Sequence, residues 1–312
     1  MTKGWRPSPT VVRAARTVFF AIALGLCVYA IVVEWRGLGD ALRQLTAPSI
    51  AGALGCVLLA LGASMLEWRT VLGDLGSPLP KAPAARIFFL SQLGKYVPGS
   101  VWVAVGQMEL AKAYGVPRHR SAATYIVVAL LTLVSALVLA GVLLPFVAGG
   151  GLTEYWWLFL VAPIGLVLLM PPLLNTLLER VLRVTRTSSH DVELTFGGVG
   201  RAVGWGLLGW FGFGGQIWLL ATSLGAPAGQ AFVVAVGGFA LAWAAGFLAV
   251  FAPAGAGARE AALVLTLSPV LSTADAIVVA LVSRLLMTVA DLGTAGAAVL
   301  IGRHSSRAAP GV

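Results

Sequence analysis

Charged side chains are scarce in this 312-residue sequence, which has 21 Lys and Arg and 12 Asp and Glu residues, or 11% of the chain. Ordinary soluble domains contain about 25% charged residues. Hydrophobic residues make up 59% of the chain. A soluble globular protein and a disordered chain are both excluded, because neither keeps so much apolar surface in water. The composition predicts an all-α polytopic membrane protein.

Cysteine is also scarce, and both cysteines, Cys27 and Cys56, lie in apolar runs typical of small buried residues rather than of a disulfide framework. His119, His190 and His304 have no metal-ligand spacing, and no nucleophile elbow, Walker sequence or HExxH motif occurs. We therefore expect no metal and no cofactor. The net charge of +9 comes without zinc spacing or a repeated basic motif, so we also expect no nucleic-acid partner.

Seven apolar stretches are long enough for a transmembrane helix, which needs about 20 mainly apolar residues. They cover approximately residues 17–33, 49–66, 121–147, 155–174, 202–223, 229–252 and 276–301. We predict about seven or eight crossings within one domain (17–301), between a basic arm (1–16) and a short tail (302–312). Because Lys and Arg gather in the arm and in alternate loops, the N-terminus is expected in the cytoplasm of a bacterial-type plasma (inner) membrane.

The segment 84–114 does not fit this series of spans, because Val97-Pro98-Gly99-Ser100 interrupts it near its middle. Each limb reaches only about 20 Å at ~1.5 Å per residue, less than the ~30 Å hydrocarbon core. Both flanks are basic, so both ends are expected on the same side of the membrane. We predict a re-entrant helical hairpin with its tip inside the membrane.

A second broken segment, 251–268, contains Pro253, Gly255 and Gly257 before a short apolar limb. It is either a second re-entrant hairpin or a short tilted span, and the two interpretations place the C-terminus on opposite sides of the membrane. Paired interrupted helices at corresponding positions in two halves are the best sequence indication of a transporter's binding site.

Lys95 is a charged residue at the predicted tip of the first hairpin, where a membrane location makes a functional role the first hypothesis. Ser100 is placed to cap the second limb, whose free N–H groups together with an ammonium favour an anion such as a lipid phosphate. The alternative is that Lys95 only extends to the membrane interface and that the Pro-Gly pair is an ordinary turn. The residues predicted to bind a lipid here are Gln92, Lys95, Tyr96, Pro98, Gly99, Ser100 and Trp102.

Four further charged residues lie in or beside the last apolar segments. Arg259 and Glu260 are adjacent and point in different directions on a helix, so each needs a partner elsewhere. Arg284 and Asp291 are two helical turns apart on one stripe, and we predict the pairs Arg259–Asp291 and Glu260–Arg284. The four residues either form part of the substrate path or lock the bundle internally, and the sequence supports both interpretations equally.

Three other polar features receive structural interpretations. Glu67-Trp68-Arg69 follows the predicted span 49–66 and is typical of an anchor at the membrane interface. Gln107 and Gln216 are isolated in apolar surroundings, which is typical of polar contacts between transmembrane helices.

Two motifs together resemble a known family. The first is Leu93–Trp102, LGKYVPGSVW, followed by Gly106 and the run 111–116; the second is 253–262, PAGAGAREAA, followed by Ser283-Arg284-Leu285 and Asp291. They resemble the lysylphosphatidylglycerol synthase/flippase transmembrane family over most of residues 17–301. The resemblance implies a bundle with broken helices that moves lipids between leaflets. The sequence departs from the family at Ala254 and Ala256, where further Gly or bulkier residues are frequent.

The resemblance also sets the functional expectation. Bifunctional members of the family carry a separate soluble aminoacyl-transfer domain, which is not found in these 312 residues, so we do not expect a synthase or another enzyme. We expect a flippase for an anionic phospholipid, its aminoacylated form or a polyprenyl-phosphate-linked sugar, with membrane lipids as partners. The alternatives are a membrane-embedded lipid or sugar transferase, or an accessory subunit of a lipid- or glycan-modifying enzyme. An oligomer is compatible with each of these.

Overall fold

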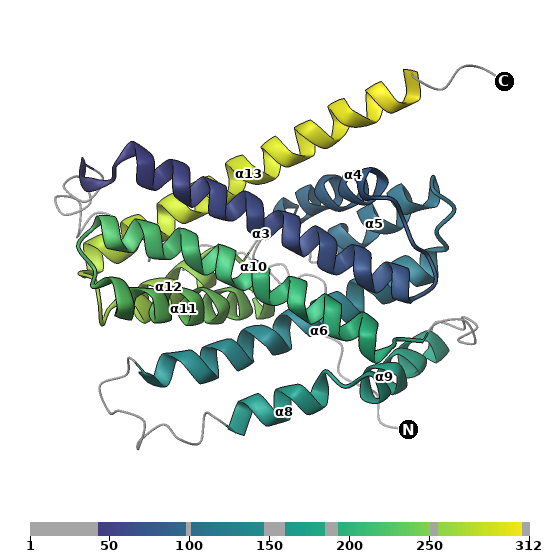
Figure 1. Ribbon diagram of the computed structural model, residues 1–312, viewed down its shortest axis with the longest axis horizontal. Helices are drawn as coiled ribbons and strands as arrows, with labels where there is room; N and C mark the ends of the chain where they lie inside the picture. The colour runs from purple at the N-terminus through teal and green to yellow at the C-terminus, as the bar shows by residue number, and fades with distance from the viewer. Residues whose placement is uncertain (1–42, 98–100, 147–159, 185–192, 250–254, 308–312) are drawn as a thin grey trace, which may run out of the picture.

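The computed structural model describes residues 43–97, 101–146, 160–184, 193–249 and 255–307. Within these ranges the chain forms ten α-helices and two short 3-10 helices and has no strand (Figure 1). By length and composition, α3 (Ala47–Asp74), α6 (Arg118–Leu143 with its extension to Phe146), α11 (Ala228–Leu248) and α13 (Thr273–Arg307) are able to cross a membrane. The predicted all-α polytopic membrane fold is confirmed. The number of crossings stays a prediction, because the arm and the span 17–33 lie outside the described residues.

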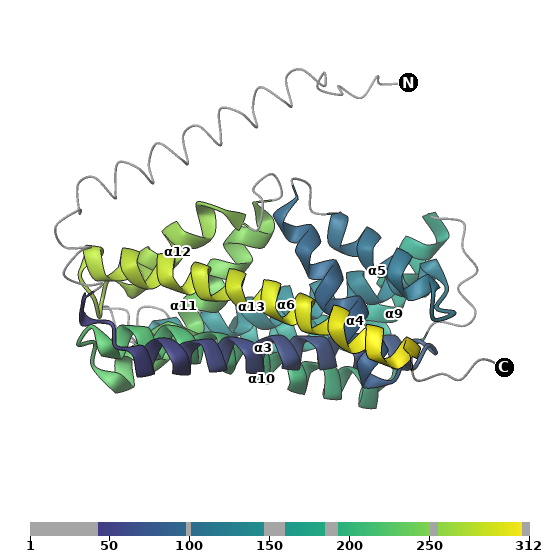
Figure 2. The same cartoon turned by 90° about the horizontal axis from the view of Figure 1, so that it is seen from above.

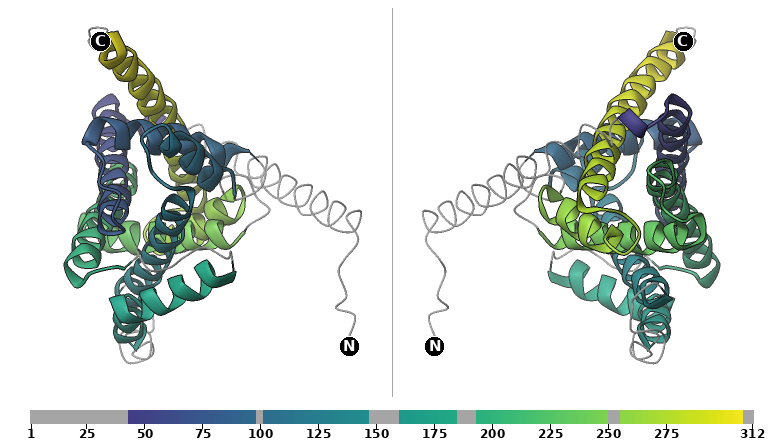
Figure 3. Two further views of the ribbon diagram at one scale, coloured as in Figure 1. Left: turned by 90° about the vertical axis from the view of Figure 1, so that its right-hand side faces the viewer. Right: turned by 90° about the vertical axis from the view of Figure 1, so that its left-hand side faces the viewer.

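Helices α3 and α10 (Phe196–Ser223) form an antiparallel pair along one side of the molecule (Figures 1 and 3). Small residues allow their close approach: a Cβ on Gly212 would lie 2.9 Å from Ala60 Cβ and 3.0 Å from the Cys56 carbonyl oxygen. The end of α3 is tied to the start of α10, since the Asp74 carboxylate accepts hydrogen bonds of 2.8 Å from both the backbone N–H and the hydroxyl of Thr195. Thr195 in turn caps α10.

The segment 84–114 consists of two short helices, α4 (Lys81–Gln92) and α5 (Trp102–Lys112), which pack against each other. A 3-10 helix, η1 (Leu93–Tyr96), continues α4, while Pro98, Gly99 and Ser100 lie outside the described residues. The two limbs come together through glycine, because a Cβ on Gly94 would lie 2.8 Å from the Trp102 carbonyl carbon. Neither α4 nor α5, of 12 and 11 residues, reaches the ~30 Å of a hydrocarbon core.

The second broken segment is described from Gly255 onward. Gly255 and Gly257 have φ values of 69° and 86°, which L-residues with a side chain rarely adopt. They precede α12 (Ala258–Leu267), which packs beside α11 and is followed by α13. Figure 2 shows α12 and the α4–α5 pair on the same side of the α3–α10 layer, with α12 toward the left and α5 toward the right of the view. Helix α13 continues past residue 301 to Arg307, while its candidate membrane span ends at Leu300, so the predicted boundary between the membrane domain and the tail stays a prediction.

The predicted span 155–174 is not one straight helix. From residue 160 onward it contains α8 (Val161–Leu168) and the start of α9 (Pro171–Val184), which meet at an angle of 59°. The cause is Pro171-Pro172, because proline disfavours helical backbone at the preceding residue and starts a new helix well. The span was predicted from the length of the apolar stretch, which does not reveal this bend.

Close packing of α10 on α11 yields a stability prediction. A Cβ on Gly214 would lie 2.5 Å from Val236 Cγ2 and 2.7 Å from Val236 Cα, whereas one on Gly204 of the same helix meets nothing within 4 Å. We expect Gly214→Ala to destabilise the bundle by about 1–3 kcal/mol through overpacking. Gly204→Ala is the matched control and should leave stability unchanged or slightly raised, because Ala favours helix. Thermal unfolding in detergent measures both, and equal Tm values for the two variants would contradict the packing argument.

Candidate functional site

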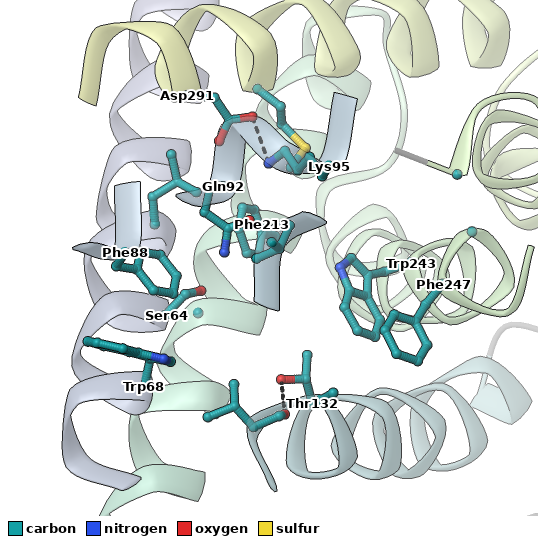
Figure 4. Close-up of a pocket in the computed structure, with 18 of the residues that line it drawn as sticks. Ser64, Trp68, Phe88, Gln92, Lys95, Thr132, Phe213, Trp243, Phe247 and Asp291 are labelled. Carbon is teal, nitrogen blue, oxygen red and sulfur yellow. Dashed lines mark hydrogen bonds and ion pairs between the residues drawn. The ribbon is translucent and has the colours of Figure 1, made fainter. Parts of the chain in front are cut away.

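A cavity of about 280 Å³ lies where the two broken segments meet α3, α6, α10, α11 and α13. In Figure 4, Lys95 points toward Asp291 at one end, while Trp243 and Phe247 stand together on another wall. Eight of the lining residues are aromatic: Trp68, Phe88, Tyr96, Tyr125, Trp210, Phe213, Trp243 and Phe247. The charged groups of the cavity therefore lie in an apolar setting, which strengthens electrostatic interactions relative to water.

Lys95 is held by Asp291 on α13. Its ammonium lies 2.7 Å from Asp291 Oδ2, and the Tyr96 hydroxyl donates to the same oxygen at 2.6 Å. Asp291 is only 2% exposed, while the Lys95 side chain is 25% exposed. The 3-10 turn of η1 places both donors beside α13, so the carboxylate is satisfied and the hairpin is fixed to the last helix.

Glu260 and Arg284 form the predicted ion pair between α12 and α13. The other oxygen of Glu260 accepts a 2.7 Å hydrogen bond from the Gly257 N–H. A carboxylate in the first turn also interacts favourably with the helix dipole. Glu260 is therefore engaged twice, and Arg284 has a carboxylate partner.

Arg259 has surroundings of another kind. Its guanidinium carbon lies 4.6 Å from the centre of the Phe239 ring, and one guanidinium nitrogen lies 2.8 Å from Met287 Sδ. Among the described residues no carboxylate pairs with it, although it lines the cavity. The predicted pair Arg259–Asp291 is wrong. Helical spacing relates residues of α12 and α13 only. It does not reveal that the turn after α4 brings Lys95 and Tyr96 to Asp291.

The other predicted site residues fall into four groups. Gln92 lines the cavity together with Lys95, Tyr96, Arg259, Arg284 and Asp291. Glu260 contacts this set through Arg284. Trp102, which is 47% exposed at the start of α5, is not among the lining residues. Pro98, Gly99 and Ser100 lie outside the described residues, so the predicted cap and its N–H groups remain predictions.

Glu67 and Trp68 were not predicted to belong to an internal site, and their interpretation as an interfacial anchor is wrong. They are 4% and 1% exposed, and both line the cavity. The reason is that α3 continues to Asp74, beyond the predicted end of the span, and the α4–α5 hairpin covers its last turns. Trp68 Nε1 donates to Gln107 Oε1 at 3.0 Å. This hydrogen bond joins α3 to α5 and confirms the predicted polar contact between helices at Gln107.

Gln216 differs from Gln107. Its side chain is fully buried in α10, and neither its amide nitrogen nor its amide oxygen has a hydrogen-bond partner in the part of the chain that the structure describes. The predicted polar contact between helices is therefore not found at this residue. Across the same part of the chain, no group of three or more His, Cys, Asp and Glu side chains is placed to hold a metal ion.

The fold and the cavity together define a multi-pass α-helical membrane protein with charged side chains gathered in an internal site. Residues 18–293 match the family model described as lysylphosphatidylglycerol synthase TM region, so the chain belongs to this family of membrane domains of lipid-related proteins. No curated protein sequence matched the chain. The match includes both motifs and every charged residue of the cavity.

The Lys95–Asp291 pair yields a second prediction. We expect Asp291→Asn to destabilise the protein, because it leaves the Lys95 ammonium without its carboxylate. Breaking a buried pair costs about 3–5 kcal/mol, and the quarter exposure of Lys95 places this one at the lower end. The double variant Lys95→Met/Asp291→Asn should be more stable than Asp291→Asn alone.

Thermal unfolding of the two single variants and the double variant measures this coupling. Glu109→Gln is the control, because the Glu109–Arg118 pair is more than half exposed on both sides and such pairs contribute about 0–1 kcal/mol. Additive effects of Lys95→Met and Asp291→Asn would show that the pair does not contribute.

Proposed function

We propose that this protein moves an anionic lipid between the two leaflets of a membrane and that the lipid's phosphate binds Arg259 in the cavity. The position of Arg259 carries the proposal. Its guanidinium lines the cavity beside Phe239 and Met287, and no carboxylate of the described residues pairs with it. Membership of a lipid-related membrane family supports a lipid as the cargo.

The charge balance of the cavity supports an anion as ligand. Lys95 is paired with Asp291, and Arg284 with Glu260, so these two pairs carry little net charge. Arg259 then supplies the positive charge that a phosphate would neutralise. Its planar guanidinium offers two parallel N–H donors to phosphate oxygens, an arrangement that Lys does not provide.

The shape of the site supports a lipid rather than a soluble anion. The aromatic walls accept the apolar parts of a headgroup, and the tail stays in the hydrocarbon, so only the head needs an internal path. An anionic phospholipid, its aminoacylated form and a polyprenyl-phosphate-linked sugar all share the phosphate that Arg259 recognises. No nucleotide-binding motif occurs in the sequence, so we propose that movement is driven by a gradient or by mass action.

The two broken segments provide a way to open and close this path. Lys95 and Tyr96 lie at the end of η1, Arg259 and Glu260 lie in the first turn of α12, and all of them contact α13. Short helices held by ion pairs shift with less disruption than complete spans, because fewer packed side chains move with them. A headgroup phosphate that competes for Lys95 or Arg284 would loosen these contacts as it passes.

A liposome assay tests the proposal. Purified protein is reconstituted into vesicles with fluorescent phosphatidylglycerol, and transfer between leaflets is followed by quenching of the outer leaflet. We expect Arg259→Ala to slow transfer by about tenfold or more, because a hydrogen bond to a charged group contributes about 1.5–3 kcal/mol. Arg118→Ala is the control, since Arg118 is exposed and does not line the cavity.

Two outcomes would contradict the proposal. The first is transfer in wild-type vesicles no faster than in protein-free vesicles. The second is equal transfer rates for wild type and Arg259→Ala. Mass spectrometry of the same vesicles addresses the transferase alternative, because a new lipid species formed by the protein alone would indicate an enzyme.

A further inference from the structure

The carboxyl group of Glu67 lies inside the cavity without a partner among the described residues. Glu67 is 4% exposed and lines the cavity on α3, and Figure 4 shows its neighbours on this helix, Ser64 and Trp68, on the same wall. No hydrogen bond or ion pair joins Glu67 to any described residue, in contrast to Asp291 and Glu260. The carboxyl lies directly against α10, since a Cβ on Gly206 would come within 3.1 Å of Glu67 Oε1.

Several polar groups on the elements that border this part of the cavity have partners other than Glu67. On α3 and α10, Arg69 donates to the Leu79 carbonyl and Arg201 to the Gly197 carbonyl. On α5, the Gln107 amide oxygen accepts from Trp68. From α6, Tyr125 lines the same cavity.

The charged groups on the remaining elements also face other partners. Lys95 of η1 pairs with Asp291 of α13, and Arg284 of α13 pairs with Glu260 of α12. Arg259 of α12 contacts Phe239 and Met287. The wall formed by α11 contributes Trp243, Gly246 and Phe247, which carry no charge. Glu67 therefore shares the cavity with three cations and is paired with none of them.

An ionised carboxylate in such a place is expensive, because burial removes most of its water and no cation or N–H group of the described residues replaces that water. Binding a proton removes the charge at little structural cost, since the carboxylic acid needs no ionic partner. We propose that Glu67 holds an exchangeable proton in the empty cavity and that binding of an anionic lipid headgroup at Arg259 is linked to this proton. This linkage rests on the proposed function, whereas the proton site itself does not.

The direction of the linkage follows from charge. A phosphate at Arg259 and an ionised Glu67 carboxylate in one apolar cavity repel each other, so the anion binds better when Glu67 is protonated. Affinity for the headgroup is then highest at low pH and falls as rising pH removes the proton. One linked proton changes the affinity by at most about tenfold per pH unit. A pH difference across the membrane would thus drive the anion and the proton in the same direction.

The proton site is tested by infrared spectroscopy of the whole protein in detergent. We expect the spectrum of wild type at neutral pH to contain a carboxylic-acid C=O band that disappears in Glu67→Gln and remains in Glu109→Gln, whose carboxylate is exposed. A band present equally in wild type and Glu67→Gln, or absent from wild type, would overturn the proposal. Absence of the band from wild type would show that Glu67 is ionised, as expected of a carboxylate that binds an organic ammonium ligand.

The linkage is tested by binding short-chain phosphatidylglycerol at a series of pH values, followed by the fluorescence of the cavity tryptophans. We expect wild-type affinity to fall by up to about tenfold per pH unit across the titration, and Glu67→Gln to bind with high, pH-independent affinity. Equal dependence of affinity on pH in wild type and Glu67→Gln overturns the linkage. An affinity of wild type that does not change with pH also overturns it, and this result requires no variant. A protein that binds no lipid at any pH overturns the linkage and the proposed function together, while the infrared result still decides the proton site.

Discussion

The carboxylate of Asp291 joins parts of the chain that are almost two hundred residues apart. It accepts the Lys95 ammonium at 2.7 Å and the Tyr96 hydroxyl at 2.6 Å, and in this way fixes the α4–α5 hairpin to the last long helix. In a membrane, where helices gain little hydrophobic free energy by associating with each other, polar contacts and close packing determine the arrangement. This contact fixes the position of η1 beside α13, and it engages the carboxylate that was predicted to pair with Arg259.

The acidic groups of the cavity are of two kinds, according to whether a cation compensates their charge. Asp291 and Glu260 each have a cation and a second donor, so their negative charge is compensated. Glu67 has neither among the described residues. In a purely structural ion-pair lock, every charged group has a partner of opposite charge. Among the described residues of this cavity, Arg259 has no carboxylate partner and Glu67 has no cation partner. An internal lock therefore explains the Glu260–Arg284 pair but does not explain Arg259.

Glycine makes this arrangement possible in the backbone. Gly94 lets α5 begin against η1, and Gly206 and Gly212 let α10 lie close to α3. Gly255 and Gly257 adopt positive φ values at the start of α12. Gly94 directly precedes Lys95, and Gly257 lies two residues before Arg259.

The sequence by itself determined the class of the protein, since the low charge content excludes a water-exposed fold whatever the packing. It also located the breaks and the Glu260–Arg284 pair, because Pro, Gly and helical spacing act over a few residues. Partner choice at Asp291 and the burial of Glu67 required the tertiary structure. Each depends on which helix covers which, and that is decided by contacts between segments distant in the sequence, about which local periodicity contains no information.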